Sequence, residues 1–404
     1  MLLSKARQSL FKIYVELFKT PGAKRIASAG FIARMPVAMD AIAIILFVHS
    51  VESSYSIAGA ITAVAALTTV FSSPLWSKVA DRRGQAFVLK IAIPMRVIAI
   101  ISFVLLVKNG APIWTWFLSI FITECGSVSI GSMTRRRWVN LIDNKNKDLL
   151  STSYSFESLL DEFVYIIGPI ITTAIVAATV PVAGILLGIA FLVIGVPLIA
   201  THKKSDPAIE KSEFSERLKS VTRNKKLQAV GIPLTIAGGC FSAVNISVVA
   251  FATEKSLASS AGLVLGAWAA GGAVSAIING AIRWKISHGY RYLGYLIGMT
   301  VISLTFPFIS NLYILAAALF LQGLCVGPLL PNGLPLVTNS VPASQMTHAI
   351  TLVTSGIPLT GALSAFLSGR IIDNYGASAG LWLPFCFLLL ALTSTIPYLK
   401  EYKS

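Results

Sequence analysis

The sequence predicts an all-α integral membrane protein with twelve transmembrane helices in two pseudo-symmetric six-helix bundles. Of its 404 residues, 55% are hydrophobic and 12% charged, about half the charged fraction of a soluble domain. Apolar runs of about 20 residues, the length that crosses a bilayer, recur along the chain. The longest polar stretch, 201–226, separates six such runs from six others. This pattern excludes an ordinary soluble enzyme, a disordered protein and a disulfide scaffold.

The predicted spans follow one another with short connections, and Gly and Pro within them are tolerated in lipid. They cover 28–49, 56–79, 87–107, 113–134, 154–177, 181–200, 228–252, 259–282, 292–310, 312–336, 347–371 and 378–398. We therefore expect an N-terminal bundle over 1–200, a basic linker over 201–226 and a C-terminal bundle over 227–404. Spaced glycines in the fourth and tenth spans support an internal repeat.

The 33 Lys and Arg residues against 17 Asp and Glu give a net charge of +16. Most of the basic residues fall on segments that share one side of the membrane if the N-terminus is cytoplasmic. This is the positive-inside pattern, so both termini are predicted to be cytoplasmic. The excess charge lies on short loops and not on one folded face, which argues against nucleic-acid binding.

A short motif follows the second span. Asp81, Arg82 and Gly84 in the sequence SKVADRRGQ resemble the loop signature of the major facilitator superfamily. Ser77 and Gln85 depart from that signature. The resemblance implies the major facilitator fold and a loop that latches the cytoplasmic ends of the two halves. The alternative is an ordinary positive-inside turn.

Two further features carry the resemblance. Gly168-Pro169 in the fifth span is similar to a Gly-Pro in the family's exporters, where a kink would provide a hinge; the alternative is a kink with no directional meaning. The segments around 20–36 and 135–162 look like a bacterial subgroup of these transporters. This implies a multi-pass protein of the bacterial cytoplasmic (inner) membrane.

Ionisable residues at membrane depth are costly and so indicate function. Asp40 lies near the middle of the first span, and Glu124 and Arg96 near the middles of the fourth and third. Arg34 is shallower, and Asn245 is a polar residue of the seventh span. We consider these five to be candidates for substrate binding or proton coupling. For Asp40 the alternative is a structural ion pair with Arg96.

Acidic residues on the inner half of the fifth span form a second group. Glu157, Asp161 and Glu162 are expected to pair with Arg82 or with the basic run 135–137 as part of an inner gate. Within that run, Arg135 and Arg136 are the named candidates.

These observations predict a transporter and not an enzyme. We expect a monomer that exports a small amphiphilic or cationic compound, as a proton antiporter with no other cofactor or metal. The alternatives are proton-coupled uptake of a sugar or organic acid, and a lipid flippase of the same fold. A membrane enzyme or sensor would need a metal cluster, a nucleophile–base pair or a soluble domain, and the sequence has none of these signals.

Overall fold

A computed structural model describes residues 14–142, 146–206, 224–282, 284–341, 349–350, 353–354 and 356–403. Every regular element in these ranges is a helix. Most of the predicted linker and the beginning of the predicted eleventh span lie outside them.

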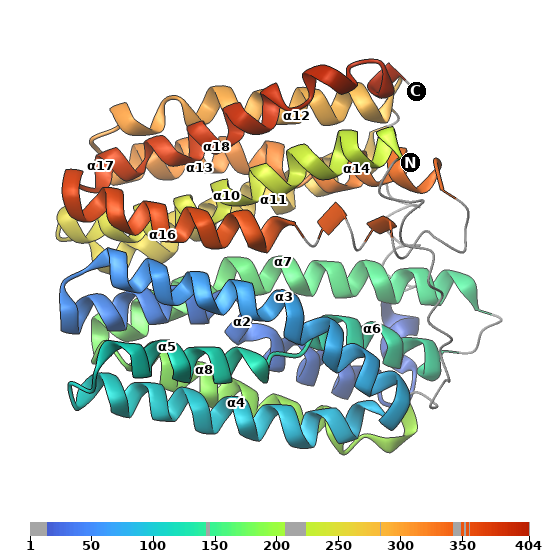
Figure 1. The fold of residues 1–404 in the computed structure, drawn as a ribbon. Coiled ribbons are helices and arrows are strands. Elements are labelled where there is room, and N and C mark those ends of the chain that lie inside the picture. Colours follow the sequence, from blue (N-terminus) through green and yellow to red (C-terminus); the bar gives the residue numbers. More distant parts are fainter. Residues whose placement is uncertain are drawn as a thin grey trace.

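The helices gather into two groups that lie side by side (Figure 1). The first group contains α2 (Ala23–Glu52), α3 (Tyr55–Arg83), α4 (Gln85–Lys108), α5 (Ile113–Cys125), α6 (Ile130–Leu141), α7 (Lys147–Ala178), α8 (Ala183–Ala200) and η1 (Lys203–Ser205). The second contains α10 (Lys225–Glu254), η2 (Ala258–Ser260), α11 (Ala261–Ala281), α12 (His288–Ser303), η3 (Phe306–Phe308), α13 (Leu312–Val326), α14 (Leu329–Thr338), α16 (Ile357–Tyr375), α17 (Ala377–Gly380), α18 (Trp382–Thr393), η5 (Ile396–Tyr398) and η6 (Glu401–Lys403).

Ten helices of the described chain are long and apolar enough to cross a membrane. The remaining two predicted spans correspond to α12 and α16. This helical order fits the predicted twelve-helix fold. The fourth, tenth and twelfth spans differ from the prediction, because each is interrupted where one continuous helix was expected. The interruptions fall between Cys125 and Ile130, between Val326 and Leu329, and between Gly380 and Trp382.

The first interruption has a packing cause at Gly126. A Cβ atom at this position would lie 2.6 Å from the Ala92 carbonyl oxygen of α4 and 2.9 Å from Cβ of Arg96. Only glycine permits such an approach of two backbones. The Trp76 indole donates a hydrogen bond of 2.6 Å to the Cys125 carbonyl, which satisfies a group freed by the break. The end of α5 is thereby held against the middle of α4.

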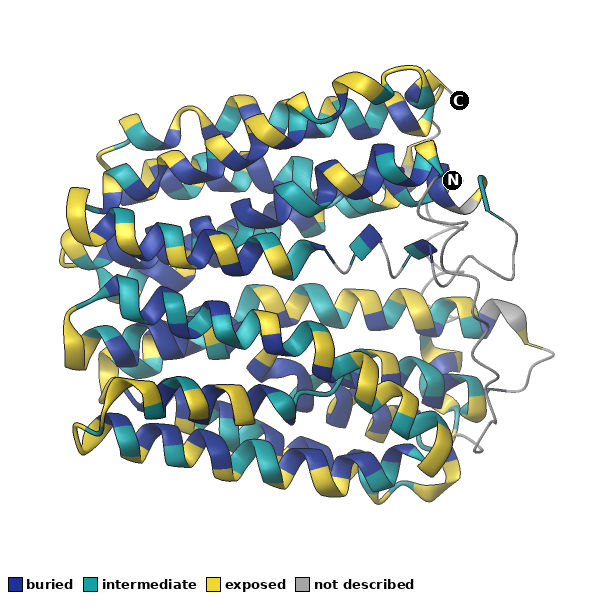
Figure 2. Cartoon of the chain, viewed as in Figure 1, coloured by how far each residue is buried: buried dark blue, intermediate teal, exposed yellow. Residues whose placement is uncertain are grey.

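The distribution of buried residues fits a bilayer environment. Large apolar side chains such as Phe71, Ile98, Tyr313 and Phe308 are at least 65% exposed, and exposed positions alternate with buried ones along the helices (Figure 2). In contrast, α2 and α10 are the most buried of the spanning helices. These two helices form the inner walls of their groups.

The described parts of both chain ends lie at one end of the molecule, together with the connection from α8 toward 206 (Figure 1). We call this the linker end and the opposite one the far end. At the far end the two groups touch. A Cβ at Gly59 of α3 would overlap the Ala365 carbonyl oxygen of α16. Similarly, a Cβ at Gly262 of α11 would overlap the Pro169 carbonyl oxygen of α7.

Candidate functional site

A cavity of about 570 Å³ lies between the two groups of helices. Its charged lining residues all come from the first group: Arg34, Asp40, Arg96, Glu124, Arg135 and Asp161. The second group contributes neutral residues, namely Ser242, Asn245, Ile246 and Ala365. The cavity is therefore chemically asymmetric.

Three charged residues form a triad in the cavity wall. The Arg96 guanidinium donates to Asp40 at 2.6 Å and to Glu124 at 2.8 Å. Their side chains are 11%, 27% and 8% exposed for Arg96, Asp40 and Glu124 respectively. The partnership between Asp40 and Arg96 considered from the sequence is thus present, yet all three residues also line the cavity.

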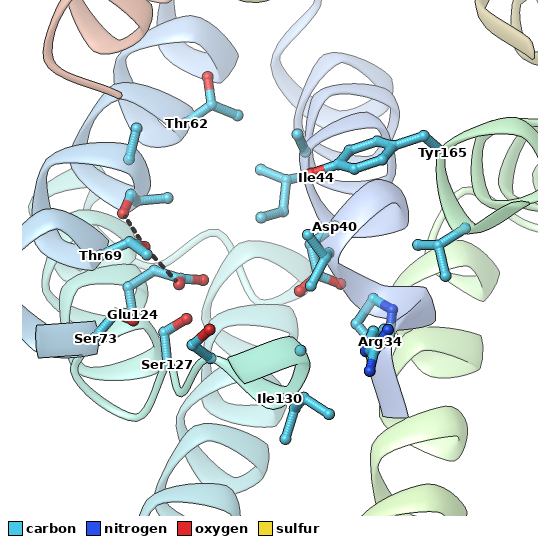
Figure 3. A pocket seen from close by; sticks show the side chains of 18 of the residues that line it. Arg34, Asp40, Ile44, Thr62, Thr69, Ser73, Glu124, Ser127, Ile130 and Tyr165 are labelled. Atoms are coloured by element: carbon cyan, nitrogen blue, oxygen red, sulfur yellow. Dashed lines mark hydrogen bonds between the residues drawn. The ribbon is translucent and has the colours of Figure 1, made fainter. Parts of the chain in front are cut away.

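Local packing brings the triad together. Gly126 allows α5 to approach α4, so Glu124 comes within reach of Arg96. On the other side, a Cβ at Gly188 of α8 would lie 3.1 Å from Oδ1 of Asp40, so this glycine leaves room for the carboxylate. Thr69 donates to Glu124 at 3.1 Å. Figure 3 shows Glu124 and Thr69 on one wall of the cavity, with Asp40 on the helix opposite.

The triad has one more negative than positive charge when all three residues are ionised. Removing a charge from water is costly unless a partner compensates it, and one guanidinium compensates only one of two carboxylates. The triad is therefore suited to accept a proton or a cationic group. Asp40 is the most exposed of the three side chains.

A second cluster lies nearer the linker end. Arg34 forms ion pairs with Glu157 and, at 2.9 Å, with Asp161. Arg135 pairs with Asp161 at 2.5 Å, and the Trp138 indole donates to Glu157 at 2.6 Å. Pairing of Glu157 with Arg34 was not expected from the sequence. Arg34, a candidate for substrate binding or proton coupling, also lines the cavity.

The remaining gate candidates lie around the loop after α3, except Glu162, which lies on α7. Asp81 pairs with Arg136 of α6, within the same group of helices. Arg82 is exposed, and Gly84 has a φ of 86°, which favours glycine, between α3 and α4. Glu162 lies half-buried next to Asp161. A latch from this loop to the second group stays a prediction.

We predicted that the basic run 135–137 pairs with the acids of the fifth span, but Arg137 has other partners. Its fully buried guanidinium donates to Gln85 at 2.8 Å, to Ser205 at 2.9 Å and to Asp206 at 3.1 Å. It therefore connects the loop after α3 to the start of the linker. Nothing in the sequence pairs Gln85 with this arginine, because 52 residues separate them.

The proposed hinge lies inside a continuous helix, since α7 runs through Pro169 without interruption. Gly168 faces α2, where an added Cβ would lie 2.9 Å from that of Ala38. Asn245 lines the cavity, and its amide donates to the Phe241 carbonyl at 2.9 Å. Neither observation tests the hinge or the role proposed for Asn245.

Comparison with known proteins agrees with this architecture. The sequence model of the Major Facilitator Superfamily matches residues 26–309 and 258–402. The chain belongs to the major facilitator superfamily. This family consists of multi-pass membrane transporters of small molecules and not of enzymes, and the long apolar helices of the chain are those of a multi-pass membrane protein.

Two curated relatives match over short stretches. A gentisate transporter of Corynebacterium glutamicum is 27% identical over 104 residues, or 26% of this chain and 23% of the relative. A gallate transporter of Pseudomonas putida is 28% identical over 115 residues, or 28% and 26% of the two chains. The chain thus spans about a quarter of the length of each relative.

Solved structures match over almost the whole chain. The nucleoside transporter NupG has a TM-score of 0.71 at 13% identity, covering 94% of this chain and 98% of its own. A bacterial homologue of the iron transporter ferroportin, in an inward-facing state, has a TM-score of 0.69 at 14% identity, with coverage of 94% and 99%. At these identities the similarity establishes the fold alone.

Proposed function

We propose that this protein is a proton-coupled secondary transporter that exports a small cationic or amphiphilic compound by alternating access. The triad of Asp40, Arg96 and Glu124 in the cavity wall is the observation on which the proposal depends. Its surplus negative charge can be neutralised by a proton or by the cationic group of a substrate. Competition between the two for one site is the simplest basis of antiport.

The arrangement of the two groups supports an access cycle. They touch at the far end, while the cavity lining extends from Ile45 and Thr62 to Arg34 and Arg135, toward the linker end. With the predicted cytoplasmic termini and a location in the bacterial inner membrane, the cavity would receive its substrate from the cytoplasm. Rocking of one group against the other would then expose it to the opposite side.

Uptake of an organic acid is the second candidate, and the gentisate and gallate transporters favour it. Protonation of Asp40 would release one edge of the Arg96 guanidinium, to which a substrate carboxylate could then bind in a bidentate manner. This scheme uses the same triad for symport. The charged lining of the cavity differs from the wide apolar cavity expected of a lipid flippase, so we do not propose that activity.

Transport by purified protein in proteoliposomes tests both candidates. A panel of organic cations and aromatic carboxylates is offered under a pH gradient of each sign. We expect accumulation of a cation against an opposing proton flux, and loss of gradient-driven accumulation in Asp40→Asn with substrate exchange retained. Glu254→Gln, which changes a far-end carboxylate outside the cavity lining, is the matched control.

The two candidates give different results. Accumulation of a carboxylate together with protons would contradict export of a cation. It would instead support the second candidate, uptake of an organic acid. Normal gradient-driven transport by stable Asp40→Asn protein would exclude Asp40 as the proton carrier and assign that role to Glu124. A transport rate that is the same with either sign of the pH gradient would refute proton coupling.

A further inference from the structure

The far end of the molecule contains a polar contact between the two groups of helices. Asp373, near the end of α16, accepts hydrogen bonds from the backbone N–H groups of Tyr55 and Ser56, each at 2.8 Å. It also accepts one from the Ser54 hydroxyl, at 2.8 Å. Ser54 to Ser56 form the beginning of α3. One carboxylate of the second group therefore caps a spanning helix of the first.

This cap completes the helix terminus. The first N–H groups of an α-helix have no partner within the helix. At α3, the N–H of Ile57 donates to the Ser54 hydroxyl, whereas the two preceding N–H groups donate to the Asp373 carboxylate. A carboxylate at this position also interacts favourably with the positive end of the helix dipole. Separation of the two groups at the far end would return both partners to water.

The surrounding contacts hold the partners in register. A Cβ at Gly369, one turn before Asp373, would overlap the Tyr55 carbonyl oxygen, so the two backbones touch. The Tyr55 ring stacks on His49 of α2 with ring centroids 4.0 Å apart. The acceptor and its donors are thus both fixed by packing when the far end is closed.

We propose that Asp373 is a gating residue that holds the far end closed by capping α3 across the interface between the two groups. We call this contact the far-end clasp. It rests on the alternating-access part of the proposed function and is independent of the substrate and of the coupling ion. It also differs from the loop at Asp81, which lies at the linker end.

The protein contains a matched control for this role. Glu254 of α10 accepts a hydrogen bond of 2.7 Å from the backbone N–H of Ala377, at the beginning of α17. This is also an exposed carboxylate on a helix beginning at the far end, but both partners belong to the second group. The hydrogen bond lost with Glu254 therefore lies within that group, and its loss should affect the gate much less than loss of Asp373.

The clasp is tested by distance measurement on the purified full chain in lipid nanodiscs. Spin labels are placed at Val180 and Phe308, which are exposed at the far end on opposite groups, in a background without the four native cysteines. We expect Asp373→Asn and Asp373→Ala to raise the ratio of open to closed far ends by about two- to fivefold. We expect Glu254→Gln to change the ratio much less than either Asp373 variant, and added salt to reduce the difference between the Asp373 variants and wild type.

A steric variant separates failure of the clasp from failure of alternating access. Gly262→Trp should prevent closure of the far end, because even a Cβ there would overlap Pro169. If Gly262→Trp widens the label distance while both Asp373 variants match wild type, the clasp is wrong and alternating access stands. If Glu254→Gln opens the far end as much as Asp373→Asn, the clasp is also wrong. If no variant changes the distance, both ideas fail.

Discussion

Removal of the central cation of the triad should destabilise the protein in a pH-dependent way. Arg96→Gln leaves Asp40 and Glu124 without the guanidinium that lies 2.6 and 2.8 Å from them. Breaking a buried ion pair by removing one partner costs about 3–5 kcal/mol. In contrast, Asp40→Asn leaves Arg96 paired with Glu124, a neutral arrangement with no uncompensated buried charge, and should cost much less.

The sign of the pH dependence follows from the charges. Without the guanidinium, repulsion between the two carboxylates grows as the pH rises, so destabilisation is larger at pH 8 than at pH 5. As the pH falls, protonation removes the repulsion, and the deficit relative to wild type should shrink. Thermal unfolding of purified protein between pH 5 and pH 8 measures this directly. We expect a melting temperature about 5 °C or more below wild type at pH 8.

Arg135→Gln is the control, because Arg135 is 37% exposed and its partner Asp161 keeps a second bond to Arg34. Partly exposed pairs contribute about 0–1 kcal/mol, so its melting temperature should change little at any pH. If Arg96→Gln melts as wild type does at pH 8, the triad does not hold its carboxylates as an ion-paired unit. A deficit that grows on acidification would also refute the reasoning.

Three further predictions concern topology and the linker end. A cysteine at position 210 should react with a membrane-impermeant thiol reagent only from inside and one at position 52 only from outside. The reverse labelling pattern would show that the predicted topology is inverted. Asp81→Asn removes the charge that faces Arg136 and should shift the inward/outward ratio several-fold with folding retained, as measured by spin-label distances at the linker end. Arg137→Met removes the donors to Gln85, Ser205 and Asp206, so limited proteolysis should cut near 206 at least about tenfold faster than in wild type, and an unchanged rate would argue against this anchor.

The fold class could be predicted from local properties of the sequence, namely its apolar runs. A bilayer demands about 20 apolar residues for each spanning helix, so the number and order of the spans could be read from hydropathy. The same local rule identified Asp40, Arg96 and Glu124, because a charge in an apolar run is conspicuous. It did not identify Thr69 or Gln85, because an uncharged polar residue is not conspicuous in these segments. Their hydrogen bonds, to Glu124 and Arg137, join residues 55 and 52 positions apart.

The sequence suggested the pairs of Asp40 with Arg96 and of Asp161 with the run 135–137, but other partnerships between charges were decided by tertiary structure. The sequence offered Arg34 as a candidate for substrate binding or proton coupling without indicating its partners, and packing of α2 against α6 and α7 pairs it with Glu157 and Asp161. The break at Gly126 had no hydropathy signal, yet it turns Glu124 toward Arg96. Asp373 lies at the end of a span, where a polar residue is ordinary, and its contact with α3 crosses 317 to 319 residues. Hydropathy acts through each helix's own contact with lipid, whereas pairing requires the relative positions of helices, and these are set by close packing between distant segments.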